Sequence, residues 1–463
     1  MDLSNQWRRD DQYAFLLGGM MWVLIVLMIV PEGFDYEGLH TVGAPSSGGP
    51  VSRLLWLTLL ALAAIVVVAR VHLVVLLTRF VNPFLPLFVL FAILSIGWSI
   101  DPGLSARRLV RMVTIVLTSV AFVSMAWHPR RFQNVLRPIV TIMIVGSLAF
   151  GLAFPALAIH SETAPELLGA WHGLANHKNG LGALSCIGLI LWLHAGLTGE
   201  VRRLPALAGC CVALISLVLS RSSTSMLAAV FTSAFLLLML RSRPGLRPYQ
   251  PYIVAILVAL LLVYALALLN LIPGMSVLLA PITALTTKDA TLTGRTEIWA
   301  ILADHIREHP MLGTGYAAYW HADPMPGSDS YDFIVRMGGF YPGSAHNGFM
   351  EVTNDLGWVG LACLIAYIIT FARQATSLLP LEANQSTLYL ALFFQQVISN
   401  QSESHWFTVL SVDFVIMTLA TMALARSLLE HRLRTIFGEP ARATTLGHMG
   451  TAHSMPRPPG TGS

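Results

Sequence analysis

The sequence has few charged residues, and this scarcity excludes whole classes of protein. Only 11% of the 463 residues are charged, whereas roughly 25% is usual for a soluble domain. Hydrophobic residues make up 55% of the chain, and the mean hydropathy is +0.67. This composition excludes a water-soluble globular enzyme and a disordered chain. The apolar residues form long runs, which excludes an outer-membrane barrel, because barrel strands alternate polar and apolar residues.

Cysteine and lysine are also scarce. All four cysteines, Cys186, Cys210, Cys211 and Cys363, lie within apolar runs. Sulfur behaves there as a small hydrophobic group, so we expect neither a disulfide framework nor a zinc site. Of the 28 basic residues, 26 are arginine, and most fall in short gaps between apolar runs. That placement is typical of membrane orientation, so the pI near 9.0 does not indicate nucleic-acid binding.

What the sequence does contain is a series of apolar runs that can cross a bilayer. A spanning helix needs about 20 mostly apolar residues, because hydrocarbon offers backbone groups no hydrogen-bond partner. We predict an all-α, polytopic transmembrane protein with about 12 spans, in a transmembrane domain over residues 1–437. The predicted spans are 13–30, 54–77, 83–100, 108–127, 133–154, 177–195, 204–220, 222–240, 251–272, 345–371, 384–400 and 406–425. Arg70 and His72 interrupt the second run, so residues 70–80 either belong to that span or form a separate interfacial helix.

The distribution of arginine predicts the orientation. If the N-terminus is cytoplasmic, 18 of the 28 basic residues fall on the cytoplasmic side, as the positive-inside rule requires. An even number of spans then places both termini in the cytoplasm. Residues 438–463 are rich in Pro, Gly, Thr and Ser, and we predict a disordered cytoplasmic tail there.

The largest predicted extramembrane segment is the loop 273–344, on the outer side between the ninth and tenth spans. A loop this long within a compact protein is usually functional. One helical pattern occurs in it, with Thr296 as the predicted N-cap and Pro310 as the stop. Its apolar residues recur at a spacing of three or four: Ile298, Trp299, Leu302 and Ile306.

Three basic residues on the predicted outer side are candidate ligand-binding residues. Arg221 lies in a tight turn among small hydroxyl residues, Arg295 stands at the start of the loop helix, and Lys178 begins the sixth span. Such residues either extend to lipid headgroups and nearby acids, or form a cationic pocket for a lipid-linked phosphate or pyrophosphate. The pocket interpretation is favoured for Arg221, because its neighbours give a guanidinium no reason to pack there. The headgroup interpretation is favoured for Arg107, Arg108 and Arg111.

His346 is the candidate catalytic residue, at the point where the loop re-enters the membrane. If Ser344 caps the next helix, His346 lies in its first turn, where the helix dipole favours neutral imidazole. A neutral imidazole can act as a general base, and a capping or interfacial histidine is the alternative. Asn347, Glu351 and Asp355 continue one stripe of that helix. Carboxylates at this depth should face a pocket or pair with arginine, so Asn347 and Glu351 are candidate substrate-binding residues.

Other motifs do not lead to a metal or a cofactor. His305 to His309 fit an H-x-x-E-H zinc pattern, but Pro310 ends the helix and no third ligand is evident. Residues 313–318 fit a dinucleotide fingerprint without the βαβ unit that it requires. No D-x-D pair is present to hold a metal and a sugar nucleotide. We therefore predict no metal, no cofactor and no cytoplasmic nucleotide-sugar transferase.

Several short segments together resemble the O-antigen ligase/polymerase (Wzy-C) superfamily, in its exopolysaccharide polymerase (ExoQ-like) branch. The segments are 98–102 with Arg107, 177–180, 219–225, 293–299, 310–316, 346–351 and 356–357. Each is short, and their order along the spans carries the resemblance over roughly residues 85–425.

The resemblance implies an enzyme that joins oligosaccharides carried on undecaprenyl pyrophosphate, at the periplasmic face of a bacterial inner membrane. His346 matches the histidine proposed to activate the acceptor hydroxyl. Arg221 and Arg295 match the arginines proposed to hold the donor's pyrophosphate, and Lys178 matches the basic residue of a K-N motif. A chain-length regulator or export complex would be a further partner.

The predicted function is therefore a metal-independent glycosyltransferase that polymerises lipid-linked repeats into exopolysaccharide. One alternative is an O-antigen ligase, which transfers a polysaccharide to lipid A-core; segments 177–179 and 220–225 favour the polymerase. A second is a transporter of the lipid-linked oligosaccharide, which predicts charges at mid-bilayer and broken helices related by repeats. The cations lie at one face instead, which disfavours transport. A structural scaffold in an export complex is the remaining alternative.

Overall fold

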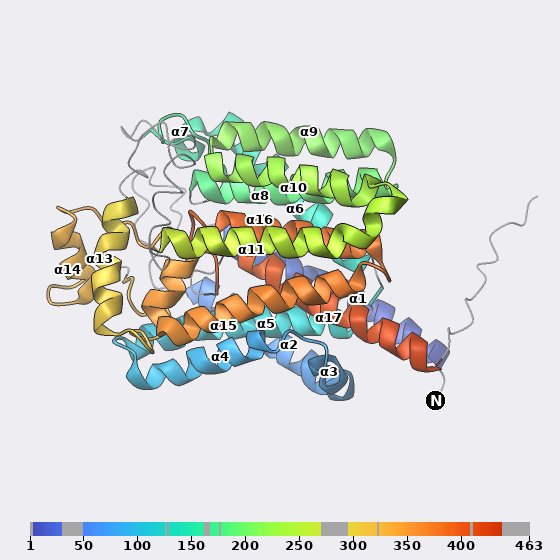
Figure 1. Cartoon of the computed structure of the whole chain (residues 1–463), viewed down its shortest axis with the longest axis horizontal. Coiled ribbons are helices and arrows are strands. Elements are labelled where there is room, and N and C mark those ends of the chain that lie inside the picture. The colour runs from blue at the N-terminus through green and yellow to red at the C-terminus, as the bar shows by residue number, and fades with distance from the viewer. Residues whose placement is uncertain are drawn as a thin grey trace, which may run out of the picture.

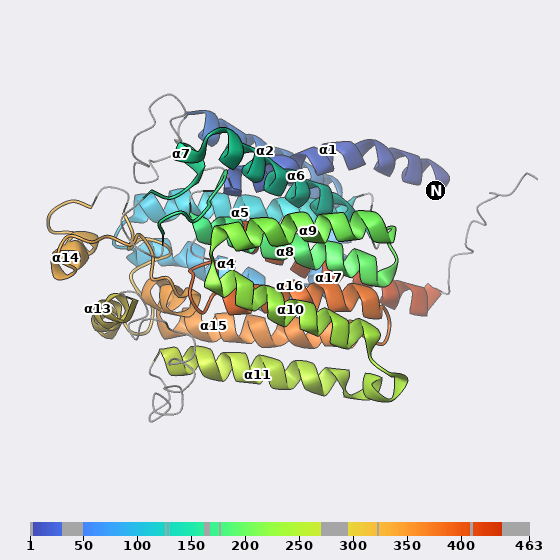
Figure 2. The same ribbon diagram turned by 90° about the horizontal axis from the view of Figure 1, so that it is seen from above.

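The protein is a bundle of helices that lie side by side along one direction (Figures 1 and 2). The computed structural model describes residues 3–29, 50–125, 127–128, 130–161, 167–175, 177–269, 295–321, 324–407 and 411–437. In these residues the only β-structure is an isolated bridge between Ile159 and Trp171. The predicted all-α, polytopic fold is confirmed.

Each predicted span coincides with a helix. The long helices are α1 (Leu3–Ile29), α2 (Pro50–Ala69), α4 (Phe84–Leu94), α5 (Pro102–Ser124), α6 (Arg131–Ala153), α8 (Lys178–Thr198), α9 (Arg203–Ser220), α10 (Ser223–Arg241), α11 (Gln250–Leu268), α15 (Gly348–Leu378), α16 (Ala383–Ser399) and α17 (Val412–Phe437). Short 3₁₀ helices follow α4 and precede α11, at η1 (Ser95–Trp98) and η2 (Pro244–Tyr249). Within the described residues, eight helices are long and apolar enough to cross a membrane. The total of about 12 spans therefore stays a prediction.

The ambiguous region 70–80 contains a helix of its own. The backbone of Arg70 is not helical, with φ −117° and ψ 25°, and α3 (Val71–Thr78) follows it. The alternative of a separate helix is therefore confirmed. Val71 and Val75 are exposed on α3.

The bundle has apolar side chains on its flanks as well as in its interior. Of the most apolar windows, those of α8 and α17 are 72% and 89% buried, whereas that of α2 is 22% buried. Leu204 and Val230 are among the large apolar side chains that remain exposed on outer helices. A surface of this kind is stable against hydrocarbon, and the chain is therefore a multi-pass membrane protein.

The helix predicted in the long loop is present as α13 (Arg295–Glu308). The four apolar residues that recur along it at a spacing of three or four, Ile298, Trp299, Leu302 and Ile306, are all buried. The predicted cap is wrong, because the helix already includes Arg295 and Thr296 lies inside it. A second helix was not predicted: α14 (Asp329–Arg336) is capped by Ser328, whose side chain accepts from the Tyr331 N–H. With the one-turn helix α7 (Pro155–Ala158), these elements lie at one end of the bundle (Figure 1).

The segment 310–316 packs against α15 at the point where that helix is kinked. Gly357 breaks that helix with φ 64° and ψ −164°. The Trp358 N–H donates to the Pro310 carbonyl at 2.9 Å, and the Gly315 N–H donates to the Asp355 carbonyl at 2.9 Å. A Cβ atom on Gly357 would lie 2.3 Å from the Met311 carbonyl carbon. Glycine is therefore required there by both conformation and space.

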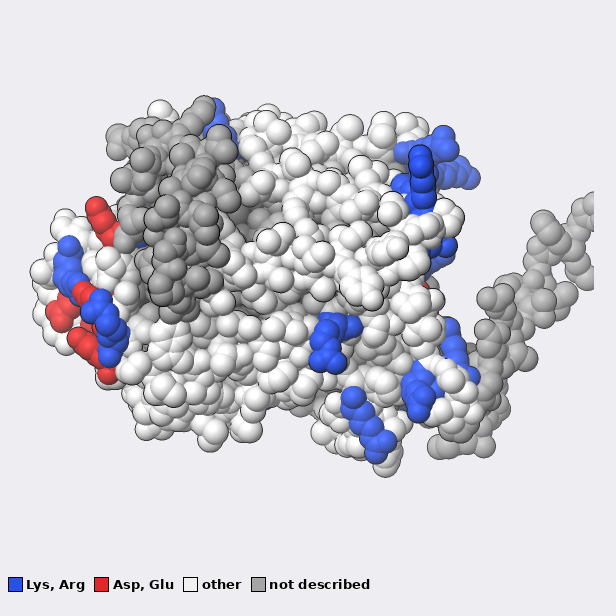
Figure 3. Space-filling view, in the orientation of Figure 1, with Lys and Arg blue, Asp and Glu red and all other residues white. Residues whose placement is uncertain are grey.

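Basic side chains gather at the end of the bundle where α1 begins and α17 ends (Figures 1 and 3). The exposed arginines in this region include Arg202, Arg203, Arg241, Arg243 and Arg247. We call this the basic end, and the end that carries α13 and α14 the loop end. Residues 438–463, the predicted tail, lie outside the described part of the chain.

Candidate active site

A carboxylate that the sequence analysis did not select joins the predicted site residues. Glu403 lies in the connection between α16 and α17, at the loop end. Its Oε1 atom lies 3.3 Å from Nη2 of Arg295 and 2.5 Å from Nδ2 of Asn179. Its Oε2 atom lies 3.6 Å from Nδ1 of His346. The structure thus brings Arg295 and His346 to the same side chain.

Glu403 is ionised in this environment. Burial alone would raise the pKa of its carboxyl group, but His346, Arg295 and His405 favour the charged form and lower the pKa to about 2. The site therefore holds a permanent negative charge between two of its basic groups at neutral pH.

His346 precedes α15 rather than lying in its first turn. The helix begins at Gly348, and the Asn347 side chain accepts hydrogen bonds from the Phe349 and Met350 N–H groups, both at 3.0 Å. Asn347 is the N-cap, so the prediction that Ser344 caps the helix is wrong. His346 has a left-handed backbone, with φ 48°, and its side chain is 26% exposed. The predicted position of His346 in the first turn, on which the expected effect of the helix dipole depended, is therefore wrong.

Asn347 and Glu351 lie beneath the site and support it. Their relative exposures are 0% and 1%. Oε2 of Glu351 accepts from the Ala345 N–H at 2.6 Å and from the Ser404 hydroxyl at 2.9 Å. The Ser404 hydroxyl also accepts from the Asn347 N–H at 3.2 Å. These bonds tie the segment that carries His346 to the connection that carries Glu403, and the substrate-binding role of both residues stays a prediction.

Lys178 lies beside a group of histidines at the start of α8. His177 is the N-cap of that helix, and its Nδ1 accepts from the Asn179 N–H at 3.3 Å. The His160 ring lies 4.7 Å from the His172 ring and 5.3 Å from the His177 ring, between centroids. Burial lowers the pKa of His177 to about 4, against the opposing effect of Glu403. A neutral His177 is what its role as a hydrogen-bond acceptor requires.

Arg221 lies in the turn between α9 and α10, and among the described residues no hydrogen bond or ion pair joins it to Arg295, His346 or Glu403. It caps α9 with a left-handed backbone, φ 51°, and its exposed guanidinium donates to the Leu168 carbonyl at 2.8 Å. The next turn reaches the Glu403 connection, because the Thr224 and Ser402 hydroxyl oxygens are 2.6 Å apart. Arg221 therefore lies at the same end as Arg295 and His346 and is linked to them through the backbone next to Glu403.

The other outer arginines divide between structural and exposed positions. Arg108 donates to the Ala317 carbonyl at 2.6 Å and to the Trp320 carbonyl at 2.8 Å, so it holds the outer loop rather than a headgroup. Arg111 lies over the Trp56 ring, 5.8 Å from its centroid. Arg107 is exposed.

His305 also has structural partners. Its Nδ1 lies 2.9 Å from Oδ1 of Asn354, and its Nε2 lies 3.4 Å from Oδ2 of Asp329. Among the described residues, no group of three or more His, Cys, Asp or Glu side chains is placed to hold a metal ion. The metal-free site stays a prediction, since no experiment on the chemistry bears on it.

Comparison with known proteins identifies the type of protein. Residues 208–365 match the model of the O-antigen ligase family, Wzy_C. The exopolysaccharide production protein ExoQ of Rhizobium meliloti (strain 1021) is 26% identical over 312 residues, which cover 65% of this chain and 67% of the relative. These matches confirm the resemblance to the O-antigen ligase superfamily. They support a membrane function of the O-antigen ligase or polysaccharide polymerase type, and thus a glycosyltransferase-like enzyme.

The part that matches the O-antigen ligase family contains Arg221, Arg295 and His346 but neither Asn179 nor Glu403. Glu403 was missed because it lies in a short gap between two predicted spans, and no motif marks it. A signal was present: residues 399–405 are all polar, on the predicted outer side. An acid in such a gap, facing the same side as the candidate arginines, is a natural partner for them.

Proposed function

We propose that this protein polymerises oligosaccharide repeats carried on undecaprenyl pyrophosphate into exopolysaccharide, at the periplasmic face of a bacterial inner membrane. The observation that carries the proposal is the meeting of Arg295 and His346 at Glu403, at the loop end of a chain whose residues 208–365 match the model of the O-antigen ligase family. The guanidinium of Arg295, which could bind an anionic donor, and the imidazole of His346, which could activate the acceptor, thus contact the same carboxylate.

The proposed reaction is a direct displacement at the donor's anomeric carbon. The acceptor hydroxyl oxygen forms the new bond to this carbon while the bond from the carbon to the pyrophosphate oxygen breaks. His346 takes the hydroxyl proton, and the bonding electrons leave with undecaprenyl pyrophosphate. General-base assistance of this kind typically contributes about 10²- to 10⁴-fold to the rate. Displacement in one step inverts the anomeric centre.

Arg295, Arg221 and Lys178 are the proposed ligands of the leaving pyrophosphate. Negative charge grows on this group as the bond breaks, and a guanidinium binds phosphate oxygens in a bidentate manner. Arg221 is exposed and Arg295 is partly exposed, so both keep N–H donors for a ligand. We propose that these cations supply the charge stabilisation without a metal.

The distribution of charge supports the proposed orientation. The arginines of the basic end would face the cytoplasm, and the loop end, which carries α13 and α14, would face the periplasm (Figure 3). Both termini would then be cytoplasmic. Donors with a polyprenyl chain would reach the site from the outer leaflet.

An O-antigen ligase is the second candidate, because the matching family model bears that description. The two candidates differ in the acceptor. The test is a reconstituted assay with the purified protein in vesicles, a defined lipid-pyrophosphate oligosaccharide, EDTA in place of divalent metal, and separation of products by size. A ladder of repeats indicates a polymerase, and a single transfer that needs lipid A-core indicates a ligase. Export of intact donor without a new glycosidic bond would contradict both.

His346→Ala and Arg295→Ala test the proposed roles in the same assay. We expect His346→Ala to reduce the rate by about 10²- to 10⁴-fold, because the hydroxyl loses its base. We expect Arg295→Ala to be of similar severity, because one stabilising contact to the leaving group is lost. Arg307→Ala is the matched control, since Arg307 lies exposed on the same helix, where it forms an ion pair with Asp304. Normal polymer output from both site variants at normal expression would refute the proposal.

A further inference from the structure

We propose that Glu403 is a positioning residue that orients His346 as the base and Arg295 as the pyrophosphate ligand. This inference rests on the proposed function and adds a residue that lies outside the part matching the O-antigen ligase family. The two carboxylate oxygens of Glu403 have different partners.

Oε2 faces the imidazole. It lies 3.6 Å from Nδ1 of His346, and that nitrogen is buried without a hydrogen bond to any described residue. A buried Nδ1–H beside a carboxylate selects one tautomer, in which Nε2 carries the lone pair. Catalytic hydrogen bonds are often long before substrate binds and shorten in the complex. In this tautomer Nε2, not Nδ1, is the nitrogen that can take the proton of the acceptor hydroxyl.

Oε1 faces the cation. It accepts from Nη2 of Arg295 at 3.3 Å and from Nδ2 of Asn179 at 2.5 Å. A guanidinium has five N–H donors, so the contact with Glu403 leaves donors free for a phosphate group. Glu403 therefore limits the rotation of the Arg295 side chain without occupying its whole binding surface.

The carboxylate is held on a rigid support. The neighbouring Ser404 hydroxyl donates to Glu351 of α15, and the Ser402 hydroxyl contacts Thr224 of α10. The Gly348 N–H at the start of α15 donates to the Asn400 carbonyl at 3.0 Å. A side chain whose connection is anchored to α10 and α15 can fix the distance between a base and a cation, which is what a preorganised site requires.

The charge of Glu403 also favours the proton transfer. Because its pKa is lowered to about 2, Glu403 stays anionic and stabilises the imidazolium that forms when His346 takes a proton. The other charged or titratable groups around this pair are Arg295, His405, Glu351 of α15 and, from the start of α8, His177 and Lys178. His405 is itself paired with Asp413, with Nδ1 2.7 Å from Oδ2. Within this set, Glu403 is the anion that lies against His346.

The test compares E403Q and E403D with wild type in the vesicle assay, over a range of pH. We expect E403Q to lower turnover by about 10²- to 10⁴-fold, because a neutral amide neither selects the tautomer nor stabilises the imidazolium. We also expect the acidic limb of its pH–rate profile to move to lower pH, because imidazolium loses the neighbouring anion. E403D is one methylene shorter and keeps the charge, so we expect an intermediate loss and an intermediate displacement of the limb.

E382Q is the matched control. Glu382 pairs with His431 at the basic end, with 2.8 Å between Oε1 and Nε2, and we expect wild-type turnover and an unmoved profile. E403Q with normal turnover, or with reduced turnover and an unmoved acidic limb, would overturn the inference. If E403Q does not fold, E403D decides in the same way. Activity that survives in E403Q but not in His346→Ala refutes only the role of Glu403, whereas activity that survives in His346→Ala and Arg295→Ala refutes the proposed function itself.

Discussion

Left-handed backbone conformations are concentrated at the loop end of the bundle. Within the described residues, the non-glycine residues with positive φ are Arg221, Ala317, His346 and Phe407, with φ between 42° and 51°. Such a conformation costs roughly 1–2 kcal/mol for most residues and persists only where the surroundings impose it. Two of the four are predicted site residues. The backbone at His346 and Arg221 is therefore determined by the contacts of its neighbours, not by its own preference.

Gly357→Ala should destabilise the protein. Its left-handed φ alone costs about 1–2 kcal/mol for alanine, and the new Cβ would meet the Met311 backbone at 2.3 Å. We expect a lower midpoint of thermal unfolding in detergent, followed by tryptophan fluorescence. Gly97→Ala is the control, because nothing lies within 4 Å of its Cβ position. Equal midpoints for the two variants would contradict the close packing of segment 310–316 against Gly357 of α15.

His177 should make stability depend on pH. Its pKa is about 4 in the folded protein, below the ordinary value of 6.5, so the unfolded chain binds more protons between these values. Stability should therefore be full above about pH 6.5 and should fall as the pH decreases toward 4. His177→Asn keeps a good N-cap but does not titrate, and we expect a smaller loss over this range.

The measurement for His177 is the midpoint of thermal unfolding as a function of pH, for wild type and variant. His128→Asn, at an exposed histidine in the connection before α6, is the matched control and should follow the wild-type curve. A His177→Asn curve parallel to wild type down to pH 4 would show that this histidine is not responsible for acid sensitivity.

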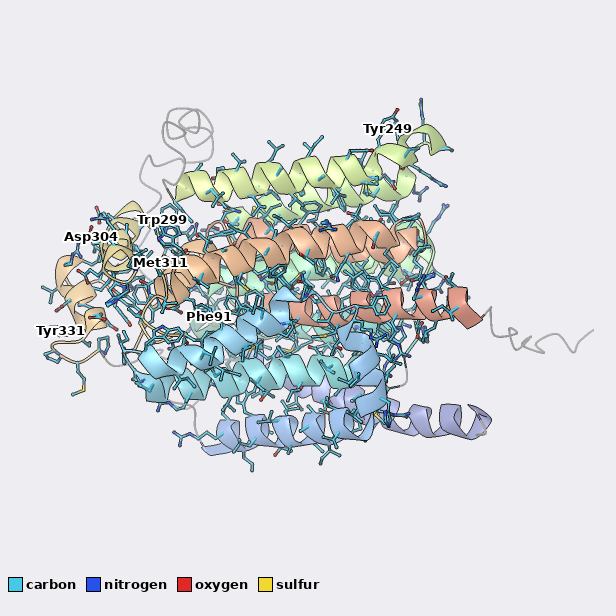
Figure 4. All side chains as sticks on the ribbon, turned by 60° about the horizontal axis from the view of Figure 1, so that its bottom comes forward. Phe91, Tyr249, Trp299, Asp304, Met311 and Tyr331 are labelled. Carbon is cyan, nitrogen blue, oxygen red and sulfur yellow. The ribbon has the colours of Figure 1, made fainter. Side chains whose placement is uncertain are left out.

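At the scale of elements, α13 positions both halves of the site. It carries Arg295 at its first residue, and Nε1 of Trp299 donates to the Ala345 carbonyl at 2.9 Å, next to His346. Its apolar face packs into a cluster with Tyr319, Trp320 and Phe333. Figure 4 shows Trp299 at the loop end with Asp304 and Tyr331, and Tyr249 at the opposite end. The docking of α13 thus sets the distance between Arg295 and His346.

Leu302→Ala should loosen this docking. Leu302 lies on the buried face of α13 and is fully buried. Truncation of a buried leucine to alanine lowers the free energy of unfolding by about 2–5 kcal/mol. Because α13 packs outside the bundle, we expect polymer formation to fall while the transmembrane helices stay folded. The measurement pairs the vesicle assay with limited proteolysis of the outer segment. Val335→Ala, at an exposed valine of α14, is the control, and an equal effect of the two changes would contradict the role of α13.

The helices were predictable from the sequence, but several of their ends were not. Apolar runs of spanning length dictate helices, because no other local structure satisfies the backbone in hydrocarbon. Ser344 and Asn347 are both suitable N-cap residues for α15 by residue type. Asn347 is the N-cap because its side-chain oxygen accepts from two N–H groups, while its side-chain amide donates to the Gln401 carbonyl. That carbonyl comes from a distant part of the chain, so no local pattern contains it.

At the scale of the whole molecule, charge separates the two ends of the bundle. The basic end carries exposed arginines such as Arg243 and Arg247, whereas acidic and basic side chains lie together over α13 and α14 (Figure 3). Anionic lipids and the insertion machinery favour arginine on the cytoplasmic side. This asymmetry predicts the topology that the proposed function requires.

Single-cysteine labelling tests the topology. In a variant with the four native cysteines replaced, Met325→Cys at the loop end and Leu246→Cys at the basic end place a thiol at exposed positions. We expect a membrane-impermeant maleimide to label position 325 in intact spheroplasts, and position 246 only after permeabilisation. The reverse pattern would place His346 in the cytoplasm and contradict the proposed function.

The sequence by itself determined the class of protein and the positions of the long helices, and it predicted the type of site. Composition and run length are local quantities, and in a membrane they are enough to dictate helices of spanning length and to predict their orientation. The tertiary structure decided that Arg295 and His346 share Glu403 and that Asn347 rather than Ser344 starts α15. Arg295 is the first residue of α13, His346 precedes α15 and Glu403 lies between α16 and α17, and only the packing of the helices brings the three together. Polar contacts between distant segments leave no periodic trace in a sequence, and for that reason Glu403 could be recognised only in three dimensions.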